Sequence, residues 1–99
     1  MQQAMLHIAS DHPAYAGHFP GRPILPGVVL LDQVQLTISA ACGLVLGGLL
    51  VAKFHSPVTP GESLRLEYRQ DAASVAFTLF HEQRKVADGK FAIAEGQAA

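Results

Sequence analysis

Residues 28–41 constrain the fold most, because apolar side chains occupy nearly every face of the helix that this stretch predicts. Pro26 is a good first-turn residue for that helix, and Gly43 is a plausible stop at its C-terminal end. A helix that is apolar all round is normally enclosed by protein. The rest of the chain must therefore wrap around it.

The segments around this helix alternate apolar and polar residues, as half-buried β-strands do. The expected strands cover residues 4–9, 49–58, 64–69, 74–82 and 85–95, with a turn at Gly47-Gly48 and a bulge at Asp88-Gly89. One sheet can cover one face of a single helix, and a second copy of the chain would cover the opposite face. The predicted fold class is α+β, an antiparallel sheet wrapped around one long central helix, in a dimer.

Ninety-nine residues predict one domain spanning 1–99, with a frayed tail at 96–99. The sequence is 49% hydrophobic and only 15% charged, whereas typical domains are about 25% charged. So few charges indicate that part of the surface is buried against another chain. A net charge of −1 lacks the basic excess needed to neutralise phosphates, so nucleic acid is not an expected partner.

Residues 33–52 are twenty residues without a charge, which is long enough to span a bilayer. Polar side chains in the first half, and Gly43, Gly47 and Gly48 in the second, argue against a span. The N-terminus lacks the features of a signal peptide, and the single cysteine, Cys42, requires no oxidising compartment. We therefore expect a cytoplasmic protein outside the membrane, with a membrane span as the less favoured alternative.

The predicted helix carries an aspartate, Asp32, at the end of "GHFPGRPILPGVVLLD". Asp32 could face solvent near the helix start, or accept a loop hydrogen bond, or serve as an acid. His18 lies fourteen residues earlier in a glycine- and proline-rich loop, and histidine plus carboxylate is a common acid–base set. Between them, the Gly27 N–H could polarise a carbonyl oxygen. This set suggests proton abstraction beside a carbonyl, with loss or gain of a group at the next carbon.

The same segment resembles the active-site segment of the 3-hydroxyacyl-acyl-carrier-protein dehydratases of fatty acid synthesis (FabA/FabZ type), which have the hotdog fold. It carries H-F-P-G, then P, then P-G-V, then an acid at the matching spacing. "AKFHSPVTPGESLRLE" resembles a strand–turn–strand segment of that family, and "KVADGKFAIAE" resembles its final strand. The resemblance covers roughly Ile8 to Glu95.

This resemblance implies that His18 removes the C2 proton, that Asp32 protonates or orients the departing C3 hydroxyl, and that the Gly27 N–H binds the thioester carbonyl. It implies an obligatory dimer whose sites combine the histidine of one protomer with the acid of the other. No metal or organic cofactor is implied. The acyl chain is expected in an apolar tunnel along the helix. The expected substrate-binding residues are Phe19, Leu25, Pro26, Gly27, Val28, Phe54 and His55.

The implied partner is a thioester of acyl carrier protein or CoA. An acidic carrier would meet surface cations. Arg22 is the best candidate for docking it because it lies in the active-site loop, and Lys53, Arg65 and Arg69 are further candidates. Scattered surface cations are usually only solvated, so this docking patch is the weakest of the predicted sites.

Departures from the family pattern keep other functions open. The family usually has glutamate where this chain has Asp32, although one branch has aspartate, and it often has glutamine where this chain has Leu36. The chain is also short at its N-terminus, which suggests a specialised pathway such as polyene synthesis. One alternative is a non-catalytic acyl-binding subunit that completes a heterodimer with a homologue. Another is a hotdog thioesterase, which the H-F-P-G loop disfavours.

Overall fold

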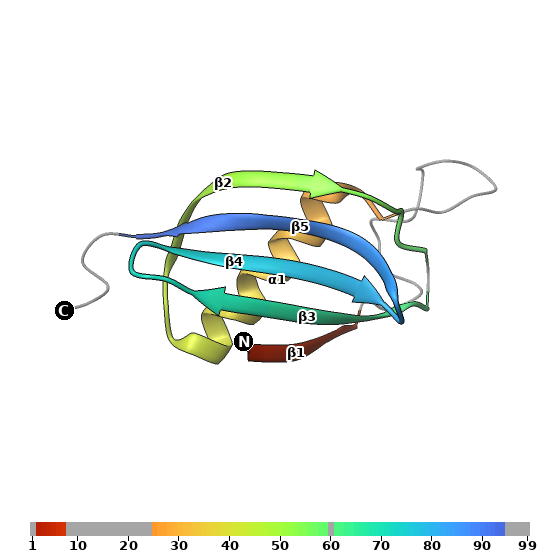
Figure 1. Cartoon of the computed structure of the whole chain (residues 1–99), viewed down its shortest axis with the longest axis horizontal. Coiled ribbons are helices and arrows are strands. Elements are labelled where there is room, and N and C mark those ends of the chain that lie inside the picture. Colours follow the sequence, from red (N-terminus) through yellow and green to blue (C-terminus); the bar gives the residue numbers. More distant parts are fainter. Residues whose placement is uncertain (1, 8–24, 60, 95–99) are drawn as a thin grey trace.

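A five-stranded antiparallel sheet lies across a single helix in the computed structural model (Figure 1). The structure describes residues 2–7, 25–59 and 61–94, so the predicted frayed tail lies outside the described residues. The elements are β1 (Gln2–His7), α1 (Gly27–Cys42), β2 (Leu46–Phe54), β3 (Ser63–Gln70), β4 (Ser74–His81) and β5 (Arg84–Ile93). The strand order β1-β3-β4-β5-β2 makes β1 and β2 the two edges.

Both ends of α1 follow the sequence signals. The Pro26 carbonyl accepts hydrogen bonds from the N–H groups of Val29 (3.0 Å) and Leu30 (3.2 Å), which starts the helix. Gly43 adopts a left-handed conformation with φ of 67°, and its N–H donates to the Ser39 carbonyl at 2.9 Å. A left-handed glycine of this kind ends a helix without the steric cost of a Cβ. The predicted helix and its stop are confirmed.

The core lies between the sheet and one face of α1. Leu30, Val34 and Ile38 recur at i, i+4 and i+8, so they form one stripe, and all three are buried. The sheet meets that stripe with alternate residues of its central strands, including Leu64, Leu66, Val75, Leu79 and Val86. On the other face of α1, Val28 is 79% exposed and Leu36 is 58% exposed. The described part of the chain thus leaves apolar side chains of this helix face exposed, and the predicted second copy stays a prediction.

Two local predictions in the strands are wrong. Gly47 and Gly48 do not form a turn but lie inside β2, where the pairing with β5 shifts register between Leu46 and Val51. Two glycines without side chains let the edge strand bend within the sheet instead of reversing. The expected bulge at Asp88-Gly89 is also absent, since Asp88 and Gly89 pair regularly with β4.

In the pairing of β4 with β5, the register shift lies instead between Leu79, which pairs with Ala87, and Phe80, which pairs with Lys85. Gly89 has a different role. A Cβ at Gly89 would overlap the Val51 carbonyl oxygen and would lie 2.9 Å from the Phe77 ring. The glycine therefore permits the close approach of β2 to β5.

The uncharged stretch at residues 33–52 is divided between the end of α1 and the start of β2. Among the described residues, no helix is long and apolar enough to cross a membrane.

Candidate active site

The first turn of α1 borders a cleft of about 420 Å³, here called the Gly27 cleft. Its far wall is the segment that follows β2. The Leu25 N–H donates a hydrogen bond to the Val58 carbonyl at 2.9 Å, which ties the two walls together. The described residues that line the cleft are Leu25, Gly27, Leu30, Phe54, His55, Ser56, Pro57 and Val58.

Gly27 shapes this cleft by having no side chain. A Cβ there would lie 2.7 Å from Cζ of Phe54, so the Phe54 ring rests against the helix backbone. The Gly27 N–H is in the first turn, where helix N–H groups have no intrahelical partner. No described residue accepts a hydrogen bond from it. Such an N–H, at the positive end of the helix dipole, can stabilise negative charge that develops on a carbonyl oxygen.

His55 is held at the rim of the Gly27 cleft by an acidic partner on β5. Its Nε2 lies 2.6 Å from Oδ2 of Asp88, and Nζ of Lys85 lies 3.1 Å from the same oxygen. The backbone N–H of His55 also donates a hydrogen bond to the Val86 carbonyl at 2.8 Å. The hydrogen bond with His55 is the main reason that the pKa of Asp88 lies below its usual value, and Lys85 adds to this against the opposing effect of burial.

This pair predicts a pH-dependent contribution to stability. Because the pKa of Asp88 is lower in the folded chain than its ordinary value of 3.8, the ionised carboxylate stabilises the fold above that value. The contribution is lost as the pH falls through the folded-state pKa. Between about pH 5 and pH 2, we expect the wild type to lose about 0.2–1 kcal/mol more unfolding free energy than Asp88→Asn.

The measurement is urea denaturation at a series of pH values. Asp71→Asn is the matched control, because no cation among the described residues pairs with the Asp71 carboxylate. If Asp88→Asn and Asp71→Asn follow the same pH profile, the His55–Asp88 pair contributes nothing measurable.

A second cleft, of about 360 Å³, lies between the exposed face of α1 and the start of β2, and is here called the Asp32 cleft. Asp32 is exposed in the isolated chain, as one of the sequence alternatives expected. The described residues that line the cleft are Val28, Val29, Leu31, Asp32, Gln35, Gly47, Leu49 and Phe91. None of these also lines the Gly27 cleft. Within one chain, Gly27 and Asp32 therefore line different clefts.

The residues predicted for the site fall into four groups. Those that line the Gly27 cleft are Leu25, Gly27, Phe54 and His55. Those that line the Asp32 cleft are Val28 and Asp32. Pro26 holds the N-cap position and is in neither set of described lining residues. His18, Phe19 and Arg22 lie outside the described residues.

Three polar residues near these clefts were not among those predicted for the site. Asp88 contacts His55, and Lys85 contacts the same carboxylate oxygen of Asp88. Only the register of β2 against β5 reveals this, because the segments are far apart in the chain. Gln35 shares the cleft of Asp32. Its spacing of three residues from Asp32 on a helix was a signal that could have placed the two side chains together.

Comparison with known proteins identifies the family. A family model for ApeI-like proteins, described as ApeI dehydratase, matches residues 1–90. The chain belongs to the ApeI-like dehydratase family. This ApeI-like chain is 33% identical to the 3-hydroxyacyl-acyl-carrier-protein dehydratase FabZ of Rhizobium rhizogenes, over 81% of this chain and 57% of that protein. It spans between 49% and 65% of the length of several such curated relatives.

Solved structures extend the comparison to the fold. The dehydratase heterocomplex ApeI:P from Xenorhabdus doucetiae matches the ApeI-like chain with a TM-score of 0.81 and 27% identity, over 94% of this chain and 86% of that chain. A mutant of the fluoroacetyl-CoA-specific thioesterase FlK matches with a TM-score of 0.70 over 95% of this chain and 87% of that chain, but at 6% identity, so that likeness concerns the fold alone. The predicted hotdog fold and the FabA/FabZ-like resemblance are confirmed.

Proposed function

We propose that this ApeI-like chain removes water from 3-hydroxyacyl thioesters of acyl carrier protein, leaving trans-2-enoyl thioesters. One observation carries the proposal beyond family membership. The carbonyl-binding N–H of Gly27 and the acid Asp32 lie near the start of the same helix but open into different clefts. Two half-sites of this kind are completed when a second chain brings its Asp32 to the Gly27 cleft of the first.

In the proposed reaction, His18 accepts the C2 proton of the substrate. The electrons of that C–H bond form the double bond between C2 and C3, and the C3–O bond breaks. Asp32 of the other chain gives its proton to the departing hydroxyl, which leaves as water. The Gly27 N–H stabilises the negative charge that develops on the thioester oxygen. One substrate thus gives one enoyl thioester and one water.

The edge strand β2 supports the assembly of two chains. An edge strand presents unpaired N–H and C=O groups, which natural proteins usually protect with charges or a short strand length. Here β2 is nine residues long, and Leu49, Leu50, Val51 and Phe54 are each between 43% and 59% exposed. Pairing β2 with β2 of a second copy would cover these side chains, together with Val28 and Leu36 on α1.

A heteromeric assembly is the second candidate. The neighbour of highest structural similarity given above is itself a dehydratase heterocomplex. Leu36, where the family often has glutamine, leaves an apolar side chain one turn beyond Asp32. In this candidate, the chain pairs with a homologue that supplies the other half-site.

The test is a turnover assay with purified protein and a 3-hydroxyacyl carrier-protein substrate, read by mass spectrometry. Loss of one water from the acyl group by the chain alone supports the homomeric dehydratase. Product that forms only after a homologous hotdog chain is added supports the heteromer. Free acid instead of enoyl thioester would indicate a thioesterase. No product, while a FabZ control is active, contradicts both dehydratase forms.

A further inference from the structure

The far wall of the Gly27 cleft is a segment without helix or strand, residues 55–59, which lies between β2 and β3. Such a segment has no ladder of hydrogen bonds, so its position depends on individual attachments. Its first half is attached to β5. The backbone N–H groups of His55 and Ser56 donate to the Val86 carbonyl at 2.8 Å and 3.2 Å.

The second half of the 55–59 segment is attached through Glu62. Oε1 of Glu62 accepts a hydrogen bond from the Thr59 N–H at 2.7 Å, and the Glu62 N–H donates to the Thr59 carbonyl at 3.4 Å. Gly61 lies within this turn with φ of 86°, a left-handed conformation that glycine adopts without strain. The Glu62 carboxylate therefore closes the turn that follows the wall of the cleft.

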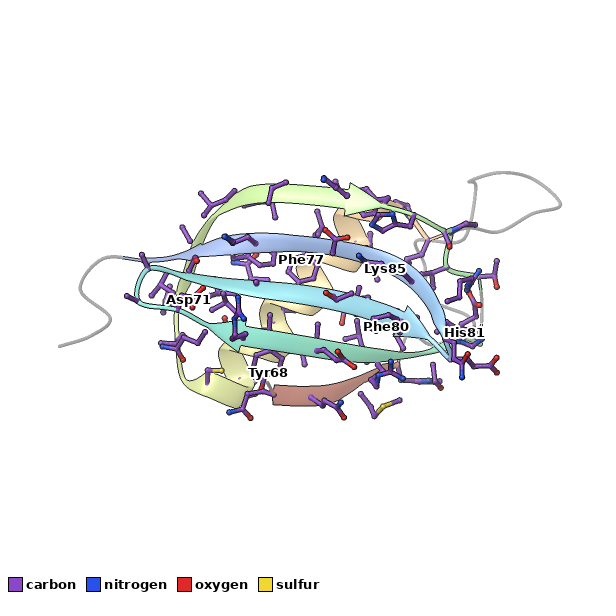
Figure 2. All side chains as sticks on the ribbon, in the orientation of Figure 1. Tyr68, Asp71, Phe77, Phe80, His81 and Lys85 are labelled. Atoms are coloured by element: carbon purple, nitrogen blue, oxygen red, sulfur yellow. The ribbon has the colours of Figure 1, made fainter. Side chains whose placement is uncertain are left out.

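The other carboxylate oxygen of Glu62 joins this turn to the β4–β5 hairpin. Nη2 of Arg84 binds Oε2 of Glu62, and Nε2 of His81 lies 3.5 Å from the same oxygen. Nδ1 of His81 lies 3.0 Å from the Ser63 carbonyl oxygen, which can only accept a hydrogen bond, so this contact orients the ring. Figure 2 shows His81 at this end of the sheet, where β4 ends. Both halves of the 55–59 segment are thus attached to the same hairpin.

Glu62 is more shielded from solvent than the other carboxylates in the described ion pairs. Its side chain is 15% exposed, against 21% for Glu67 and 26% for Asp88. Burial alone would raise the pKa of Glu62, but the hydrogen bond from Thr59 and the charge of Arg84 outweigh it, so the pKa lies below its ordinary value of 4.5. Glu62 is therefore ionised at neutral pH, and solvent screens its contacts less than those of an exposed pair.

The attached wall also contacts the segment that leads into α1. Val58, next to Thr59, is 2% exposed, and its carbonyl accepts the hydrogen bond from the Leu25 N–H at 2.9 Å. Leu25 is 4% exposed and lies two residues before Gly27. Because buried side chains are closely packed, a shift of Val58 would be passed on to Leu25. A chain of contacts thus runs from the Glu62 carboxylate through the wall to the start of the helix.

We propose that Glu62 is a positioning residue that holds the Gly27 N–H in place for the substrate carbonyl. Glu62 is not among the described residues that line either cleft, so it acts through the turn and the 55–59 segment. The binding of a carbonyl at Gly27 rests on the proposed function, whereas the attachment of the wall rests on the described contacts alone. No local sequence pattern indicates this role, since Arg84 is 22 residues from Glu62.

The first test compares Glu62→Ala and Glu62→Gln by steady-state kinetics with a 3-hydroxyacyl thioester. Alanine removes both carboxylate contacts, and we expect kcat/KM to fall about 10-fold, mainly through kcat, because a misplaced N–H weakens transition-state stabilisation more than substrate binding. Glutamine keeps an oxygen for the Thr59 N–H, so its loss should be only about 3-fold. Glu67→Ala is the matched control and should keep wild-type activity, since it breaks a comparable ion pair with Arg65 outside both clefts.

The second test does not depend on activity. Amide hydrogen exchange, followed by NMR, reports on the N–H groups of Leu25 and Thr59, which the wall attachments protect. In Glu62→Ala, these two groups should exchange about 10-fold faster than in the wild type, because the wall opens locally. The N–H groups in the centre of β4 should change much less, since they exchange only when the sheet itself opens.

Unchanged exchange of the Leu25 N–H in Glu62→Ala would overturn the positioning role. So would equal acceleration throughout β4, which would mean only a less stable fold, or an equal loss of activity in Glu67→Ala. If Glu62→Ala does not fold, Glu62→Gln and Arg84→Gln carry the same comparison. If the wild type turns over no thioester, the proposed function fails, and the exchange result alone decides whether Glu62 positions the wall.

Discussion

The His18→Ala variant should lose nearly all dehydratase activity, with kcat/KM falling about 10²–10⁴-fold below the wild type. In the proposed mechanism, His18 is the base that removes the C2 proton, and alanine cannot accept a proton. The measurement is enoyl-thioester formation at neutral pH with saturating and subsaturating substrate. Asp32→Asn should cause a loss of similar size, because the amide cannot give a proton to the departing hydroxyl.

His7→Ala is the control for the first variant, because His7 is an exposed histidine at the end of β1, away from both clefts. Its activity should match the wild type. Thermal unfolding of each variant separates loss of chemistry from loss of fold. A folded His18→Ala protein that keeps its full rate would remove His18 from the mechanism.

Gly89→Ala should destabilise the fold by about 1–3 kcal/mol or more, which is the usual cost of forcing an extra methyl group into a packed site. The added Cβ would meet the backbone carbonyl oxygen of Val51 and the ring of Phe77. The carbonyl cannot move without β2 shifting away from β5, and the Phe77 ring is buried and stacked on Phe91 at 5.4 Å. For a domain of this size, we expect the melting temperature to fall by roughly 4–8 °C per kcal/mol.

The matched control is Gly48→Ala in the neighbouring strand β2. A Cβ at Gly48 would meet no heavy atom within 4 Å. Alanine there should leave stability unchanged or raise it slightly, because it restricts the unfolded chain. A Gly89→Ala variant as stable as Gly48→Ala would show that the β2–β5 contact relaxes more easily than its geometry indicates.

Sequence alone predicted the parts of the fold that depend on local physics. Pro26 and Gly43 act within a few residues of themselves, so the ends of α1 were recognisable. The predicted alternation in β3 and β4 also appears in the structure, where buried residues alternate with less buried ones. Each of these features follows from helix capping or from the two-residue period of a strand.

The features that sequence did not predict depend on which strands become neighbours. Gly47 and Gly48 resembled a turn because a glycine pair usually marks one, and only the pairing of β2 with β5 shows them inside a strand. Asp88 lies beside His55 only because β5 runs antiparallel to β2. The separation of Gly27 and Asp32 into two clefts likewise emerges from the packing of α1 on the sheet.

We expect each active site to take His18 from one chain and Asp32 from another, and mixing two inactive variants tests this directly. His18→Ala and Asp32→Asn proteins carrying different affinity tags are unfolded, combined in equal amounts and refolded. Tandem affinity purification then isolates the mixed dimers, so that their fraction can be measured. In a mixed dimer, one of the two shared sites has both native residues. With half of the dimers mixed, we predict about a quarter of wild-type activity. Mixed dimers that are no more active than either variant alone would contradict the shared site.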